Sequence, residues 1–303
     1  MPLSLALGIG IYLVLHYVPG LDDTAYLGVA RWLQPAVVGL MLFIQLNVVS
    51  PSDLHWRRWH WWLLAYQTLM LAALVYVATV IEPGGKRILL ECAILCAICP
   101  TAAAASVITP KIGGDLAGVV TYIVISDALA CVLIPLMIPI VHPEAGVTFM
   151  AAFWAVAKKV FSILALPCLL AWLIRYTLPG VQEWLARRVG AAFYVWCLSL
   201  TLAMSLATST LVESGVGIWV ALGIAAVSLL FCVGQYGLGR LFTRGLGQSD
   251  TVTGGQALGQ KNTGFIIWLG YNFMTPVSSV AGGLYAIWQN LINSWELARK
   301  GKR

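Results

Sequence analysis

Two runs of polar and helix-breaking residues interrupt otherwise apolar stretches of the sequence. The first is CPTAAAASVITPKIGGD, from Cys99 to Asp115, and the second is TVTGGQALGQKNTGF, from Thr251 to Phe265. A hydroxyl, amide or ammonium group that faced lipid would lack a hydrogen-bond partner, and each such group would destabilise the protein by several kcal/mol. These residues therefore predict a polar cavity inside the bilayer.

The side chains of these runs, together with two amides near the last apolar segment, suit an anionic solute. An ammonium, hydroxyls and amides can all donate hydrogen bonds to a carboxylate. We expect the substrate site to comprise Thr101, Ser106, Lys261, Asn262, Thr263, Gln289 and Asn290. The same groups would suit many metabolites, so this set does not define the specificity of the site.

Composition indicates where such a site must lie. Of 303 residues, 60% are apolar and 10% are charged, and the formal net charge is +6. These values exclude a water-soluble globule, and the scattered basic residues do not form a footprint for nucleic acid. We expect an all-α polytopic membrane protein whose ten apolar segments cross the bilayer near 3–19, 28–49, 59–81, 87–110, 115–141, 150–177, 189–213, 216–241, 249–272 and 276–298.

Basic residues predict the orientation of these crossings. One side of the ten-span arrangement carries Arg57, Arg58, Lys111, Arg175, Arg187, Arg188, Arg240, Arg244, Arg299, Lys300, Lys302 and Arg303. The other side carries only Lys86 and Arg87. Because basic residues are retained on the cytoplasmic side, we expect a multi-pass protein of the inner (plasma) membrane with both termini cytoplasmic. The aromatic and basic run from His55 to Trp62 is interpreted as a contact with membrane lipids.

The two interrupted segments occupy equivalent places in the two halves of the chain. They are the fourth and the ninth, so residues 1–141 and 142–303 each form one set of five spans, and an odd number makes the halves run in opposite directions. Paired broken helices in an inverted repeat are typical of secondary transporters, which bind their solute where the half-helices meet. The glycines of the ninth segment have a simpler reading as points of close helix contact.

Several stretches resemble the bile acid/sodium symporter family. FIQLNVVSPSDL (Phe43 to Leu54), Gln67-Thr68-Leu69-Met70, the run from Cys99 to Asp115, GQKNTG (Gly259 to Gly264) and IWQNLINS (Ile287 to Ser294) match its motifs in order. The resemblance implies ten helices divided into a panel and a core domain, alternating access, and an organic anion such as a bile acid or a smaller carboxylate as substrate. We also expect no cofactor and no enzymatic activity.

The resemblance fails at the sodium ligands. In the family, two sodium ions are held by polar side chains of the third, fourth, fifth and ninth spans, together with main-chain oxygens. The corresponding side chains here are Ala105, Ser106, Val119, Ile123, Ala257 and Lys261. Gln67 and Asn262 are retained, and Gln256 lies one residue from the family's glutamate position. Because a hard cation needs several oxygen ligands, we expect no bound metal.

A lysine at a sodium-ligand position can supply a tethered positive charge in place of the ion. A buried ammonium needs a counter-charge, and Asp127 lies on the helical face that carries the family's fifth-span ligands. We expect Lys261, Asp127, Gln67 and Gln256 to form the coupling site, with transport either proton-coupled or, if the charge is permanent, uncoupled or exchanging. The alternative is that Asp127 lines a wet vestibule and Lys261 is a structural cation.

Other functions stay open. Cys99 at the break of the fourth segment is compatible with an arsenite or metalloid exporter of related fold, and a sodium-coupled symporter is a further alternative. An enzyme would need a convergent nucleophile and base or a metal cluster, and none of the four histidines is placed in the sequence to provide one. The expected partners are a small organic anion, membrane lipids and, as a further candidate, protons.

Overall fold

The computed structural model describes residues 2–143, 146–188 and 190–300, which form thirteen α-helices and three short 3-10 turns. The helices are α1 (Pro2–Tyr17), α2 (Asp23–Leu46), α3 (Arg58–Val80), α4 (Gly85–Ile98), α5 (Ala105–Lys111), α6 (Leu116–Val141), α7 (Phe149–Thr177), α8 (Pro179–Ala186), α9 (Ala191–Glu213), α10 (Ile218–Thr243), α11 (Gln248–Gly259), α12 (Thr263–Phe273) and α13 (Val280–Lys300). The 3-10 turns are η1 (Pro51–Asp53), η2 (Arg244–Leu246) and η3 (Pro276–Ser279).

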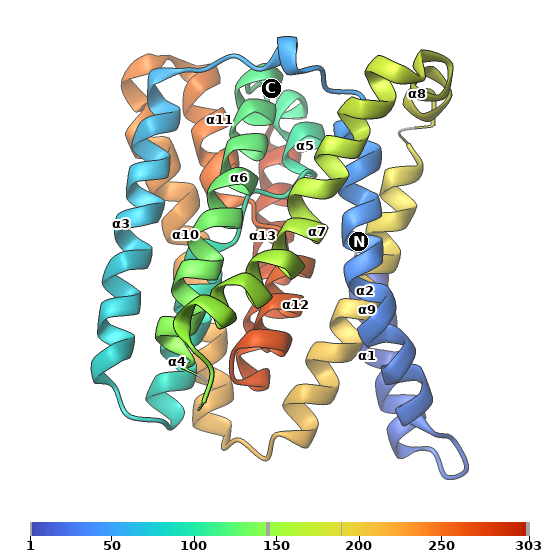
Figure 1. Cartoon of the computed structure of the whole chain (residues 1–303), viewed down its shortest axis with the longest axis vertical. Helices are drawn as coiled ribbons and strands as arrows, with labels where there is room; N and C mark the ends of the chain where they lie inside the picture. Colours follow the sequence, from blue (N-terminus) through green and yellow to red (C-terminus); the bar gives the residue numbers. More distant parts are fainter. Residues whose placement is uncertain (1, 144–145, 189, 301–303) are drawn as a thin grey trace.

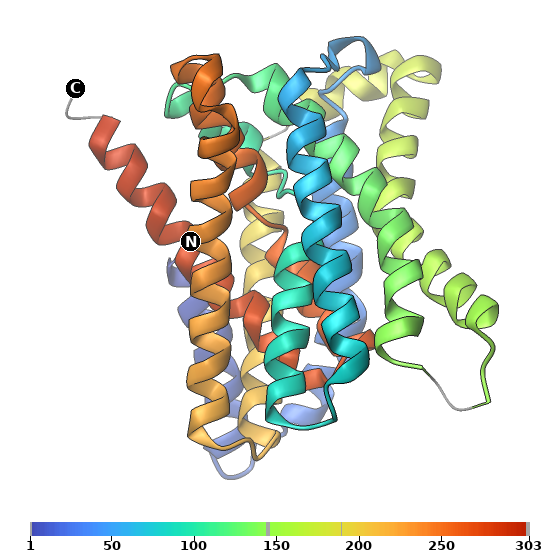
Figure 2. The same cartoon turned by 90° about the vertical axis from the view of Figure 1, so that its left-hand side faces the viewer.

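The helices divide into two groups that lie side by side. One group contains α1, α2, α7 and α9, and α2 packs against both α7 and α9 (Figure 1). The other contains α3, α4, α6 and α10–α13, with α10 packed on α4, α11 and α13. In the second view α13 runs obliquely, and its C-terminal end projects from the bundle (Figure 2).

Polar side chains fix where several helices begin. The Asp115 carboxylate accepts hydrogen bonds from the N–H groups of Ala117 and Gly118 at the start of α6. Thr148 accepts from Ala151 N–H at the start of α7 in the same way. Such caps satisfy backbone donors that have no partner inside the helix. The start of α6 and the start of α7 are therefore each fixed by an N-cap residue, Asp115 and Thr148.

Two helix pairs are broken near the middle of the molecule. α4 and α5 form one pair, and α11 and α12 form the other (Figure 1). The two pairs run in opposite directions, so the ends of all four half-helices face the same region. The C-terminal ends of α4 and α11 bring partial negative charge to it, and the N-terminal end of α12 brings partial positive charge.

Glycines let α10 and α11 approach closely. A Cβ on Gly239 would lie 2.7 Å from the carbonyl carbon of Gly254 and 3.1 Å from Cα of Gly255. A Cβ on Gly259 would enter the ring of Tyr236. Close helix packing thus accounts for the glycines of α11, and the polar residues that follow them remain to be explained.

The all-helical fold is confirmed. Among the described residues, six helices are long and apolar enough to cross a membrane, namely α2, α3, α6, α7, most of α9, and α10 with its η2 extension. The ten predicted segments coincide with single helices or with the two broken pairs, but ten crossings in an inverted repeat, divided at residue 141, stay a prediction. The short helix α8 was not predicted. Residues 302 and 303 of the basic set lie outside the described residues.

The connections that carry the described basic residues of the larger set lie at one end of the bundle. This end holds η1, α8, the end of α10 and the C-terminal end of α13 (Figure 1). The α3–α4 turn with Lys86 and Arg87 lies at the opposite end. The arrangement supports a multi-pass membrane protein, whereas the cytoplasmic location of the basic end and the identity of the membrane stay predictions. Within the run from His55 to Trp62, Trp59 and His60 are buried, and Trp56, Trp61 and Trp62 are exposed.

Candidate functional site

The two chain breaks cross one another as a short antiparallel bridge between Thr101 and Lys261. Ala102 N–H donates to the Gln260 carbonyl at 2.8 Å, and Asn262 N–H donates to the Pro100 carbonyl at 3.0 Å. These bonds satisfy backbone groups that the interrupted helices leave free, in a region buried inside the protein. We call residues 99–104 and 260–262 the crossover.

Thr101 is tied to two further elements. Its hydroxyl donates to the Ala257 carbonyl of α11 at 2.5 Å, and its N–H donates to Ser126 Oγ of α6 at 3.1 Å. Asn262 caps α12, because its Oδ1 accepts from Phe265 N–H at 3.2 Å. The Cys99 thiol donates to the Asn262 carbonyl over 3.1 Å between sulfur and oxygen. Side chains of the first break thus donate hydrogen bonds to backbone carbonyls of the second break and of α11.

Amide and phenol side chains support the crossover from neighbouring helices. Gln67 of α3 donates to the Ile98 carbonyl at 3.2 Å, and Gln235 of α10 donates to the Cys96 carbonyl at 3.2 Å, both near the end of α4. The Tyr285 hydroxyl lies 2.7 Å from the Gly259 carbonyl at the end of α11. Each bond satisfies or shares a terminal helix carbonyl, so these residues hold the half-helix ends in position.

Lys261 is the charged group of the crossover. Its side chain is fully buried, and within the described chain its Nζ has no hydrogen-bond partner and no ion-pair partner within 4.0 Å. Its backbone N–H donates to Gln289 Oε1 of α13 at 3.0 Å. The residue directly follows the C-terminal end of α11 and bridges to the strand-like segment after α4. The backbone of Lys261 therefore lies beside the C-terminal ends of α4 and α11, which carry partial negative charge.

Asp127 is a second buried charged residue, and it has no partner among the described residues. It lies on α6 with 6% of its surface exposed, and in the part of the chain described here neither carboxylate oxygen has a hydrogen-bond partner. No ion pair within 4.0 Å joins it to Lys261. The direct pairing that the sequence suggested is therefore absent from this conformation, and a coupling role for Asp127 stays a prediction.

A small cavity lies between the crossover and the other helix group. Its volume is about 10 Å³, which is room for about one water molecule. Met41 of α2 and Trp196, Ser199 and Leu200 of α9 line one side. The other side is lined by Ala102, Ala104, Lys261, Asn262, Thr263, Gly264 and Gln289. The cavity is thus too small to hold an organic anion.

The predicted substrate residues separate into two sets. Lys261, Asn262, Thr263 and Gln289 line the cavity. Thr101 belongs to the crossover but does not line the cavity. Ser106 does not line it either, and its hydroxyl donates to the Ala103 carbonyl within its own turn at 2.8 Å. Asn290 of α13 does not line the cavity either, and its side-chain amide has no partner in the described residues.

The predicted coupling residues also separate. Gln67 supports the crossover, as described above. Gln256 instead donates to Asn293 Oδ1 at 3.1 Å and to Glu296 Oε2 at 2.9 Å on α13, and Glu296 is also ion-paired with Arg240. Gln256 is therefore part of a polar network between α10, α11 and α13 rather than a neighbour of the lysine ammonium.

Sequence reasoning missed Ser126, Gln235 and Tyr285 among the supports, and it missed the α9 wall. The available signals were a serine next to Asp127 and an amide in the apolar run LFCVGQYG of the eighth segment. An uncharged amide within a membrane span is expected to find a partner inside the protein. The α9 residues that line the cavity, Trp196, Ser199 and Leu200, carry no such signal. A short stretch of sequence does not indicate which helix will pack against it.

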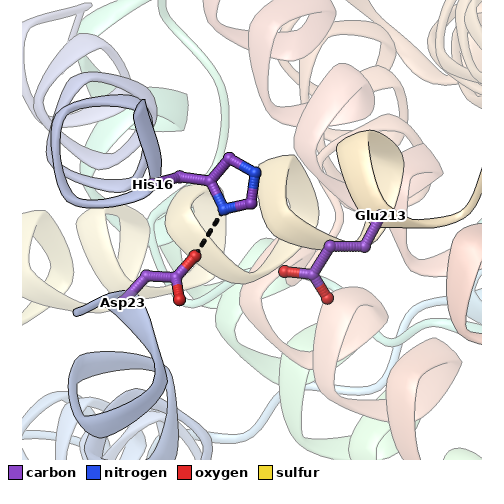
Figure 3. A group of neighbouring side chains, drawn as sticks. All are labelled: His16, Asp23 and Glu213. Atoms are coloured by element: carbon purple, nitrogen blue, oxygen red, sulfur yellow. Dashed lines mark hydrogen bonds and ion pairs between the residues drawn. The ribbon is translucent and has the colours of Figure 1, made fainter. Parts of the chain in front are cut away.

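Ligand atoms that could hold a metal occur elsewhere. In the described residues the group with suitable spacing is His16, Asp23 and Glu213, whose ligand atoms lie within 4.8 Å of one another (Figure 3). His16 Nδ1 lies 2.6 Å from Asp23 Oδ2, and the Tyr12 hydroxyl donates to Glu213 at 3.2 Å. His16 and Glu213 are exposed at the ends of α1 and α9, so an ion pair and a hydrogen bond suffice to explain the group.

Comparison with protein families gives one finding. The model of the sodium bile acid symporter family matches residues 36–214. This range includes the first broken pair, α3 and α6, and most of the first helix group. Comparison with curated proteins gives no match. Because the match covers more than half of the chain, the protein belongs to the sodium bile acid symporter family, whose members are membrane transporters of solutes rather than enzymes.

Proposed function

We propose that the protein is a sodium-independent secondary transporter of an organic anion, either bile acid-like or a small carboxylate, that works by alternating access. The observation that carries this proposal is the Lys261 side chain, which is fully buried at the crossover and has no partner in the described residues. In this proposal its ammonium occupies the place and supplies the charge of a bound cation.

The surroundings favour a tethered charge over a free ion. Val119, Ile123 and Ala257, at positions of the family's ligands, are buried and pack in one apolar cluster. Alkyl groups offer no oxygen to a sodium ion, which needs several. An ammonium carries its charge on the chain and needs fewer ligands, and the C-terminal ends of α4 and α11 offer it partial negative charge.

The cavity wall around Lys261 suits an anion. The ammonium and Asn262 Nδ2 are donors without a partner in the described chain, and both residues line the cavity. Thr263 begins α12, so the positive end of that helix faces the same space. Three sources of positive potential thus converge on a site that can select a carboxylate.

Transport requires this cavity to enlarge. An organic anion needs roughly 300 Å³ or more, far above the volume found here. The cavity lies where α2 and α9 meet the crossover, so separation of the two helix groups would open it. We infer that this conformation is closed at the site and that rocking of one group against the other gives access.

Two coupling modes fit the proposal. In one, Lys261 or Asp127 exchanges a proton during the cycle. In the other, the ammonium is permanent and the protein is a uniporter or an exchanger. Asp127 lies outside hydrogen-bond reach of any described residue, so the pairing of the two groups would belong to another conformation of the cycle.

The test has two stages. Purified protein is screened by thermal shift with cholate and a set of small carboxylates, each matched by its neutral amide. Uptake of the stabilising compound into proteoliposomes is then measured with imposed sodium or proton gradients. The proposal expects stabilisation by carboxylates only, and uptake that is equal in sodium and potassium. A strong sodium requirement would overturn it, and uptake independent of pH would exclude the proton-coupled mode.

Cys99 supports a second candidate, a metalloid exporter. Its thiol is fully buried at the crossover and is bonded to Asn262, a residue that lines the cavity. Arsenite binds thiolates, and Cys96 precedes Cys99 by about one helical turn. Expression in an arsenite-sensitive host distinguishes the two candidates. A gain of tolerance that Cys99→Ser removes would favour the exporter, whereas unchanged tolerance would exclude it.

A further inference from the structure

A long groove follows the line where α2 and α7 meet. Its volume is about 790 Å³, and its α2 wall includes Pro35, Ala36 and Gly39. Gly39 faces α7 in this groove, since a Cβ on it would come into ordinary contact with Pro167 at 3.5 Å. Leu40, Phe43, Ile163, Leu166, Leu170 and Ile174 add apolar surface. The groove is therefore shaped for a hydrocarbon chain.

Two cations lie at one end of this groove. Arg31 stacks its guanidinium over the ring of Tyr271, and Lys159 places its Nζ over the ring of Phe273, each at 5.2 Å from the ring centroid. Within the described residues neither cation has a carboxylate within 4.0 Å. Asn272, between the two aromatic residues, also lines the groove.

The protein itself neutralises this charge only in part. Tyr271 and Phe273 form the C-terminal end of α12, which carries about half a negative charge against two positive ones. The positive-inside rule does not account for the cations either, because α2 starts at the end of the bundle that is poor in basic residues (Figure 1). An anion from outside the chain is the missing partner.

Depth and length indicate which anion. Arg31 lies three residues inside the apolar segment that starts near residue 28, or about 5 Å along the helix, so its long side chain reaches the headgroup layer. From Arg31 to Phe43 the α2 wall extends about 18 Å, close to the roughly 15 Å of one leaflet. A charged headgroup at the cations and one acyl chain along the groove match both dimensions.

We propose that this groove binds an anionic phospholipid of the surrounding bilayer. The phosphate contacts Arg31 and Lys159, and one acyl chain lies between α2 and α7. Because α12 belongs to the other helix group, the headgroup connects the two groups at this end of the molecule. The bound lipid is thus placed to favour the conformation in which α12 stays next to α2 and α7.

The test uses phosphatidylglycerol and phosphatidylcholine with identical acyl chains, added to purified protein in mild detergent. Native mass spectrometry gives the number of lipid molecules bound, and the melting temperature gives the stabilisation by each lipid. We expect phosphatidylglycerol to bind and stabilise in preference. Replacing both cations (Arg31→Gln with Lys159→Gln) should weaken its binding about 30-fold, since each cation near the membrane surface contributes about 1 kcal/mol.

Lys158 provides the matched control, because it is exposed next to Lys159 but does not line the groove. Lys158→Gln should leave the preference unchanged, while Gly39→Leu should fill the groove and reduce lipid binding with both cations present. If the double variant does not fold, Lys159→Gln alone should give about a five-fold loss. Equal binding of the two lipids, full competition by inorganic phosphate, or displacement by cholate would overturn the proposal.

Discussion

Thr101 and Thr109 are both fully buried near the first break, yet their hydroxyls differ. The Thr101 hydroxyl donates to the Ala257 carbonyl, an acceptor at the end of α11. The Thr109 hydroxyl has no partner in the described chain. One hydroxyl therefore holds the crossover together, and the other is only desolvated. Valine has the shape of threonine without the hydroxyl, so the same substitution separates the two effects.

Thr101→Val should lower the free energy of unfolding by about 1–3 kcal/mol, because a buried carbonyl loses its donor. Thr109→Val, the matched control, should leave stability unchanged or raise it. Thermal melting of both variants in the same detergent measures the difference. Equal melting temperatures for the two variants would show that the crossover does not depend on this hydrogen bond.

Lys261→Met should raise the melting temperature while abolishing transport. Desolvation of an ion destabilises the folded state by several kcal/mol, whereas a helix end returns at most about 2 kcal/mol. Methionine fills a similar volume without charge. Lys111→Met, at an exposed site at the end of α5, serves as the control and should change neither property. A lower melting temperature for Lys261→Met would identify the lysine as a structural cation.

At the residue scale the sequence located Lys261 correctly in the break but misjudged its neighbours. The side chains of successive helix residues point about 100° apart, so Gln256 faces α13 while the side chain of the adjacent Ala257 packs in the apolar cluster with Val119 of α6. A motif match that is uncertain by one residue therefore changes the helical face. The distance between the charged groups of Lys261 and Asp127 could not be predicted either, because it depends on the relative placement of α6 and the crossover.

At the scale of helices, the sequence predicted the breaks because proline and glycine leave a local signal. Cys99-Pro100 ends α4, and the glycines of α11 precede its end. Helix α8 was missed, since its few residues carry no apolar period long enough to stand out. For the packing of α10 on α11, the sequence predicted only that the glycines of α11 allow close helix contact. It did not identify the residue that each glycine contacts.

Gly239→Ala should destabilise the protein by about 1–3 kcal/mol, because its Cβ would meet the backbone of α11 at Gly254 and Gly255. Backbone cannot move aside as a flexible side chain can. Gly237→Ala on the same helix is the control, since a Cβ there has no neighbour within 4 Å. Alanine also favours helix over glycine, so this control should be neutral or more stable. Equal loss of folded yield in the two variants would contradict close packing of α10 and α11.

At the scale of the molecule, composition was enough to predict a helical membrane protein, and the order of motifs was enough to predict the family. The division into two helix groups and the cavity between them required the structure, since they depend on long-range contacts. The same holds for the groove between α2 and α7. In this arrangement hydrogen bonds hold the crossover in place, and the proposed transport cycle would open the site at its interface with α2 and α9.

The central claim, that the chain carries the charge which a sodium ion would otherwise bring, is tested most directly by melting the purified protein in sodium, potassium and choline chloride at equal ionic strength. A bound ion stabilises the folded state as its concentration exceeds the dissociation constant, by about 2.7 kcal/mol at a hundred-fold excess. The account predicts the same melting temperature in all three salts. A saturating rise in melting temperature with sodium alone would contradict it.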